Sequence, residues 1–213
     1  SWKKFYKIMP YKWCFWASNK KFIFALPKAK KISKIIYFAK KLINLNNNNP
    51  AYNYFLGLAF ELNHLYDDAI KLYKKSIDLN YIEKRNALNN IGNILLTTKK
   101  PEESIHYFKK AHELDTENIY VIYNLLSNYA ELRDINNLET GLKTYKLIEK
   151  DLKTYFYYKA ELLILKNQTN EAKELLEKNL DDVRFAVKLI RLNFTTGNYE
   201  DAKQLFFKIK NKL

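Results

Sequence analysis

Two series of residues, one of large apolar side chains and one of mostly small side chains, recur along this chain at long and regular intervals. A large apolar residue recurs at intervals of 35, 34, 34 and 30 positions, at Tyr73, Phe108, Leu142, Leu176 and Phe206. A second series lies four positions earlier and is mostly small, at Ala69, Ser104, Leu138, Ala172 and Ala202. A step near 34 is typical of a helix-turn-helix unit that buries its apolar face only by stacking on copies of itself.

The two series together predict an all-α fold, a right-handed solenoid of about five helix-turn-helix repeats. Each repeat should hold two helices of about 12 to 15 residues. The second helices have recognisable starts, because acidic pairs such as Asp67-Asp68 and Glu102-Glu103 suit a helix N-terminus and Pro101 suits its first position. The expected repeats span residues 50–84, 85–118, 119–152, 153–182 and 183–213.

The first 49 residues form a separate segment in this interpretation. A helix is expected over about residues 28–45, because its apolar positions follow the helical spacing. It should pack on the first repeat, and a polar loop at 46–49 should end at Pro50. Residues 12–26 could form either a hairpin or a first helix, and their spacing does not decide between the two.

The best two repeats have further features in common. Residues 50–84 carry a Leu-Gly pair, aromatic residues and small residues at Leu56, Gly57, Phe60, Ala69, Tyr73 and Ser76. Residues 85–118 carry the corresponding set at Ile91, Gly92, Leu95, Ser104, Phe108 and Ala111. This content resembles the tetratricopeptide repeat. The later copies depart from it, since Leu126 and Leu138 replace small residues, which Ala160 and Ala172 restore. The last copy keeps a sequence close to the family's turn and second-helix start, at Gly197, Tyr199, Ala202 and Phe206.

The resemblance implies a non-enzymatic scaffold or adaptor that binds another protein as an extended or helical segment. In that family the first helices line a concave groove, and Asn and Tyr suit peptide recognition by hydrogen bonding and large contact area. Helical tyrosines can instead pack inside a repeat. The predicted groove residues are Tyr54, Leu58, Glu61, Asn86, Asn89, Asn90, Asn93, Tyr120, Tyr123, Asn124, Ser127, Tyr157, Tyr158 and Glu161, with Arg184, Lys188 and Arg191 offered by the last repeat.

Charge is distributed unevenly. Residues 1–60 hold 12 Lys and no acidic residue, so that 37 − 12 = 25 basic residues accompany all 23 acidic ones in the remainder. All three tryptophans lie within residues 1–26, which we call the basic, aromatic arm. Its candidate contact residues are Trp2, Trp13, Trp16, Lys3, Lys4 and Lys12.

Three functions for the arm compete. It could cap the exposed end of the solenoid, or dock on an anionic membrane surface, which Trp, Tyr and Lys suit. Nucleic-acid binding is less favoured, because no Arg precedes Arg85 and Lys lacks the planar fork that reads bases. As a further possibility, the arm could occupy the groove of its own molecule, or that of a neighbouring copy and so form a homodimer.

Catalytic and metal-binding patterns are absent from the sequence. His64, His106 and His112 are the only histidines, and Cys14 is the only cysteine, so we expect no metal site, no cofactor and no enzymatic activity. No run of 18 apolar residues is present. The compartment stays open between cytoplasmic and membrane-associated or cell-envelope, because an upstream targeting segment could have been removed before Ser1.

Overall fold

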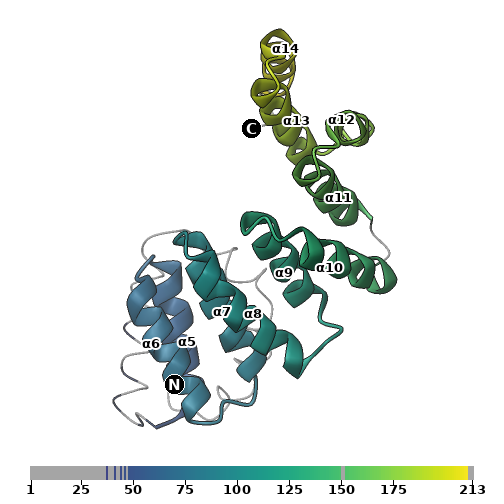
Figure 1. Cartoon of the computed structure of the whole chain (residues 1–213). Coiled ribbons are helices and arrows are strands. Elements are labelled where there is room, and N and C mark those ends of the chain that lie inside the picture. The colour runs from purple at the N-terminus through teal and green to yellow at the C-terminus, as the bar shows by residue number, and fades with distance from the viewer. Residues whose placement is uncertain are drawn as a thin grey trace. The chain divides into compact units, whose positions relative to one another are not determined.

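The computed structural model describes residues 48–149 and 152–210, together with Tyr37, Lys41, Asn44 and Asn46. The described residues form helices and no strands, which confirms the all-α prediction (Figure 1). The helices are α5 (Pro50–Leu62), α6 (Tyr66–Asp78), α7 (Lys84–Thr97), α8 (Pro101–Leu114), α9 (Ile119–Glu131), α10 (Ile135–Ile148), α11 (Lys153–Leu165), α12 (Thr169–Glu177), α13 (Val183–Thr195) and α14 (Tyr199–Ile209).

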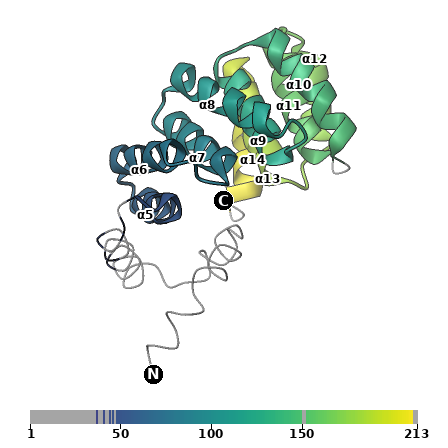
Figure 2. The ribbon, with the colours of Figure 1, turned by 90° about the horizontal axis from the view of Figure 1, so that it is seen from below.

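The chain divides into two compact units whose boundary lies between Tyr81 and Ile82. In the first unit α5 packs beside α6 (Figure 2). Gly57 of α5 permits this close approach, because a Cβ atom there would lie 2.9 Å from two ring atoms of the fully buried Tyr73. Tyr54 of α5 stacks on Tyr81, with ring centroids 4.6 Å apart.

In the second unit each helix from α7 to α14 packs against the next one along the chain. The first helices also meet each other, since α9 contacts both α7 and α11. Figure 2 shows one such pair, α7 beside α8. Helical pairs therefore stack in chain order within this unit, as the repeat period predicts.

The pair α7–α8 is packed through a glycine and an aromatic ring. A Cβ atom at Gly92 would lie 2.5 to 2.9 Å from three ring atoms of Phe108, which is fully buried. Ser104 adds a buried hydrogen bond, donating to the carbonyl oxygen of Gly92 over 2.9 Å. The small residues thus let the backbones of α7 and α8 approach closely.

Asn128 connects this pair to the next one. Its buried amide nitrogen on α9 donates to the Ser104 hydroxyl over 2.9 Å and to the Pro101 carbonyl oxygen over 3.1 Å. Both acceptors lie in the first turn of α8. A polar side chain at the interface between two repeats therefore satisfies part of its hydrogen-bonding capacity there.

The helices α9 and α10 also pack closely, but through different residues. Leu126 stands 34 positions after Gly92, and Leu142 stands 34 positions after Phe108. Space for Leu126 comes from Gly141, where a Cβ atom would lie 2.9 Å from Leu126 Cδ2. The small residue has moved from the first helix to the second, and Leu126 remains fully buried.

The last pair corrects one expectation of the sequence pattern. The large residues Tyr73, Phe108, Leu142 and Leu176 are all buried, but Phe206 is 46% exposed. Ile190 occupies the position equivalent to Gly92, 16 residues before the large residue, where α5 and α7 carry glycine. Leu205 packs against the core instead.

The turns inside the repeats share one backbone conformation. The second residue after each first helix has positive φ, between 55° and 82°, which places it in a left-handed turn. These residues are His64, Lys99, Arg133, Asn167 and Gly197. Among the second helices, α12 is shorter than expected, with nine residues.

Helix starts follow the sequence signals closely. Pro101 is the first residue of α8, with Glu102 and Glu103 in its first turn. The polar loop before α5 supplies its N-cap, because the Asn49 side chain accepts from the backbone N–H of Tyr52 over 3.2 Å.

The basic, aromatic arm lies outside the described residues, so that Trp2, Trp13, Trp16, Lys3, Lys4 and Lys12 have no assigned structure. Tyr37, Lys41 and Asn44, within the expected docking helix, are helical. None of the described helices has the length and hydropathy needed to cross a lipid bilayer.

Candidate functional site

The first helices of the second unit form a continuous surface. We call it the first-helix surface and define it by residues of α7, α9, α11 and α13: Asn89, Asn93, Tyr120, Tyr123, Asn124, Ser127, Tyr157, Glu161, Arg184, Lys188 and Arg191. Side-chain contacts join each of these helices to the next. Tyr54, Leu58 and Glu61 belong to the first unit and are described separately.

Amide side chains join α7 to α9. The Asn124 amide nitrogen donates to the Asn89 side-chain oxygen over 2.7 Å, across 35 residues of sequence. This bond leaves the Asn89 amide nitrogen and the Asn124 side-chain oxygen without a partner among the described residues. Asn93, one turn further along α7, forms no side-chain hydrogen bond with the described residues. The surface therefore offers both hydrogen-bond donors and acceptors.

Tyrosine rings join α9 to α11. Tyr123 meets Tyr158 edge to face, with centroids 5.8 Å apart, and Tyr158 meets Tyr157 in the same way at 5.3 Å. Tyr123 is 40% exposed and Tyr120 is 76% exposed, so both rings on α9 face solvent. Burial raises the pKa of the Tyr158 hydroxyl far above 10, although its hydrogen bond with Ser127 acts in the opposite direction.

Charged and aromatic contacts join α11 to α13. Lys188 lies 4.2 Å above the ring centroid of Tyr157 and forms an ion pair with Glu161. The Arg184 guanidinium lies 5.8 Å from the same ring, and Phe185 meets it edge to face at 5.7 Å. Tyr157 is therefore held from several sides.

Several predicted contact residues have a different role from the one expected. Tyr54, Asn90 and Tyr158 are buried, which corrects the expectation that they present their side chains at the surface. Helical spacing gives the direction of a side chain but not the depth of its neighbours, and Tyr54 lies beneath the ring of Tyr81. Leu58 and Glu61 are half-buried on α5, and Glu61 accepts a hydrogen bond from the Tyr73 hydroxyl over 2.5 Å.

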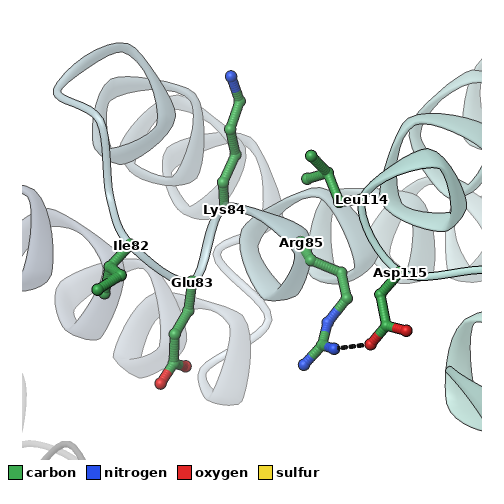
Figure 3. Close-up of a pocket in the computed structure, with 6 residues that line it drawn as sticks. All are labelled: Ile82, Glu83, Lys84, Arg85, Leu114 and Asp115. Atoms are coloured by element: carbon green, nitrogen blue, oxygen red, sulfur yellow. Dashed lines mark hydrogen bonds and ion pairs between the residues drawn. The ribbon is translucent and has the colours of Figure 1, made fainter.

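Asn86 is engaged in a different cluster, at the start of α7. Its side-chain oxygen accepts from Arg85 over 3.2 Å, and its amide nitrogen donates to Glu83 over 2.7 Å. Arg85 also pairs with Asp115 at the end of α8 (Figure 3). A hydrogen bond from Asn118 holds the pKa of Asp115 below its usual value, and Arg85 adds to the effect.

A pocket lies at this end of the α7–α8 pair (Figure 3). Its apolar walls are Ile82 and Leu114, both exposed to solvent, and its charged walls include the Arg85–Asp115 pair. Three of its charged residues already have side-chain partners, since Glu83 accepts from Asn86 and Arg85 pairs with Asp115. Within the described ranges no cluster of His, Cys, Asp and Glu is arranged to hold a metal ion.

Known proteins share both the repeat sequence and the fold. The tetratricopeptide-repeat sequence pattern matches residues 86–118, which span most of α7 and all of α8. A tetratricopeptide-repeat protein from Parabacteroides merdae is 13% identical, with a TM-score of 0.77 over 84% of this chain and 73% of that one. Residues 86–118 therefore form a tetratricopeptide repeat, and the chain has the fold of tetratricopeptide-repeat proteins.

Two further structures with tetratricopeptide-like folds are similar to it. YrrB, a tetratricopeptide-repeat protein with an unusual peptide-binding site, is 16% identical, with a TM-score of 0.61 over 71% of this chain and 77% of that one. The pilF protein of Pseudomonas aeruginosa is 17% identical, with a TM-score of 0.60 over 81% and 80%. At this level of identity the similarity establishes the fold alone. No curated protein sequence matches the chain.

Tetratricopeptide-repeat proteins are in general protein-interaction scaffolds and are generally non-enzymatic. The repeat assignment also explains the two best copies, because the glycines and aromatic residues that carry the resemblance are the ones that pack α5 on α6 and α7 on α8. Sequence reasoning did not predict the pairing of Lys188 with Glu161. Their opposite charges, 27 positions apart on successive first helices, were the available signal.

Proposed function

We propose that this protein is a non-enzymatic scaffold that binds a segment of a partner protein along the first-helix surface. The single observation that carries the proposal is the amide pair between Asn89 and Asn124. It joins two successive first helices and still leaves one donor and one acceptor unused.

The chemistry of these groups supports a peptide ligand. A peptide main chain offers one N–H and one C=O per residue, and an amide side chain can bond to both. The exposed rings of Tyr120 and Tyr123 lie on the neighbouring helix and add contact area at a small entropy cost. A partner segment lying across α7 and α9 would use both sets of groups.

The test removes these groups without touching the core. In the full-length chain, Asn89, Asn93 and Tyr123 are changed together to Ala, and proteins retained from a cell extract are compared with those retained by the unchanged chain. Partner capture should be lost while the helical circular dichroism stays the same, since none of the three side chains is buried. Unchanged capture would contradict the proposal.

A matched control uses the same residue types on second helices. Asn136 on α10, Asn170 on α12 and Tyr199 on α14 are all exposed, and their joint change to Ala removes two amides and one phenol elsewhere. This control variant should capture the same proteins as the unchanged chain. Equal loss in both variants would show a general effect on the fold and not on one surface.

The basic arm favours a second candidate function, binding to an anionic membrane surface or, less favoured, to nucleic acid. The supporting observation is the 12 Lys without any acidic residue in the first 60 positions. Changing Lys3, Lys4 and Lys12 to Gln in the full-length chain should weaken binding to vesicles containing anionic lipid, or to oligonucleotides if that alternative holds. Absence of binding to either probe by the unchanged chain would exclude this function.

A further inference from the structure

Three of the four charged side chains of the first-helix surface are paired: Glu161, Lys188 and Arg184. Lys188 and Glu161 form an ion pair between α13 and α11, and their side chains are only 12% and 25% exposed. Because both charges are largely withdrawn from water, each is the main compensation for the other. Glu131, in the last turn of α9, is likewise paired, with Lys99 at 3.2 Å.

Arg184 has its own local partner. Asp182, the N-cap residue of α13, accepts hydrogen bonds from the guanidinium of Arg184 at 2.6 to 3.1 Å and from its backbone N–H at 2.9 Å. The hydrogen bond from Arg184 holds the pKa of Asp182 below its usual value. The pair is therefore ionised on both sides and compensated within one turn of helix.

The groups of the first-helix surface that have no partner among the described residues are mostly uncharged. Asn89, Asn93 and Asn124 have open amide groups, and Tyr120 and Tyr123 have exposed rings. Arg191, exposed on α13, is the exception, because it forms no ion pair within the described residues. It lies on α13, whereas the open amide groups lie on α7 and α9.

A charged ligand would gain little on such a surface. A carboxylate or ammonium group laid against α7, α9 and α11 would lose water without meeting an opposite charge that is free to pair with it. Uncharged polar and aromatic groups meet suitable partners there, since amides bond to amides and rings pack on tyrosine.

We propose that the first-helix surface selects a partner segment without charged side chains, in which an aromatic or proline residue packs on Tyr123 and the main chain bonds to Asn89, Asn93 and Asn124. This inference rests on the proposed function and specifies the class of its ligand. It also contrasts with the net charge of +14 on the whole chain, which by itself would indicate an acidic partner.

The test is a selection of random displayed peptides on the immobilised full-length chain, run in parallel on the Asn89→Ala, Asn93→Ala, Tyr123→Ala variant. Both proteins carry the same basic arm, so peptides enriched only on the unchanged chain report on the first-helix surface. These peptides should be depleted of Asp, Glu, Lys and Arg relative to the starting library. The affinity of a synthetic copy should change less than about threefold between low and high salt, because screening acts on charges.

The possible results separate the two proposals. Surface-dependent peptides rich in acidic or basic residues would overturn the neutral-ligand inference and leave the binding function standing. If no peptide depends on the surface, the proposed function fails and the inference fails with it.

A single substitution tests whether charge pairing determines which peptides are selected. Glu161→Gln keeps the shape of the side chain but leaves Lys188 as an unpaired cation, so this variant should enrich peptides with Asp or Glu. If Glu161→Gln selects the same neutral peptides as the unchanged chain, charge pairing does not determine the choice of ligand, and the inference is wrong.

Discussion

The α7–α8 pair and the α13–α14 pair occupy equivalent positions in the repeat, yet they are packed very differently. In the first, Gly92 leaves room for the ring of Phe108, which is fully buried. In the second, Ile190 stands at the position of the glycine, and Phe206 is 46% exposed. The repeat period places a large residue at the same point of each second helix, but we infer that this residue enters the core only where a small residue nearby leaves space for it.

The intermediate pairs support this relation. Ala160 stands opposite Leu176, a smaller large residue, and both are fully buried. Leu126 stands opposite Leu142, and the additional space comes from Gly141. Packing volume is therefore shared between two positions, and a change at one of them is tolerated when the other compensates.

The turns of the same two pairs differ in backbone strain, and here the α7–α8 pair is the less favourable one. The second residue after α7 is Lys99, with φ of 62°, whereas the second residue after α13 is Gly197, with φ of 82°. A residue with a Cβ atom is strained in this left-handed conformation and glycine is not. The better packed repeat thus has the more strained turn.

The largest expected effect comes from removing the ring at each of the two equivalent positions. Phe108→Ala should lower the free energy of unfolding by about 3 to 5 kcal/mol, because it leaves a cavity in the core. Phe206→Ala should cost about 1 kcal/mol or less, since its ring is already partly hydrated. Urea unfolding followed by circular dichroism measures both. Similar losses for the two variants would refute the packing comparison.

The next effect tests the coupling between the two positions. Gly92→Ala should cost about 1 to 3 kcal/mol, because the added Cβ atom meets the ring of Phe108. Adding Phe108→Leu recreates the combination that Ala160 and Leu176 use. The double variant should be more stable than the sum of the two single changes predicts, by about 1 kcal/mol, in a double-mutant cycle. Strict additivity would show that the two residues do not share one space.

The smallest effect concerns the turns. Lys99→Gly should raise the free energy of unfolding by about 0.5 kcal/mol, after the loss of its exposed ion pair with Glu131 is taken into account. Gly197→Ala should lower the same quantity by about 1 kcal/mol, because it introduces strain at positive φ. Thermal unfolding midpoints should therefore move in opposite directions. A shift in the same direction for both variants would exclude backbone strain as the cause.

Much of the fold could be predicted from the sequence, for physical reasons that the structure makes plain. The glycines and aromatic residues that carry the resemblance to the tetratricopeptide repeat are the ones that pack together, Gly57 with Tyr73 and Gly92 with Phe108. The exposure of Phe206 required a comparison of Ile190 with the smaller residues at equivalent positions.

The candidate site was less predictable. The register assigned Asn89, Tyr123 and Asn124 to first helices that do lie together. The burial of each side chain was harder to predict, because the burial of Tyr158 depends on neighbours from α9 that no periodicity within α11 reveals. That Asn89, Tyr123 and Asn124 contact a partner stays a prediction.

The most direct test of the account is the affinity of one selected neutral peptide, labelled with a fluorophore, for the full-length chain and its two triple variants. The account predicts that Asn89→Ala, Asn93→Ala, Tyr123→Ala weakens binding by about tenfold or more, as loss of central contacts does. The control Asn136→Ala, Asn170→Ala, Tyr199→Ala should bind as tightly as the unchanged chain. Equal affinities for all three proteins would contradict the claim that the first helices bind a partner.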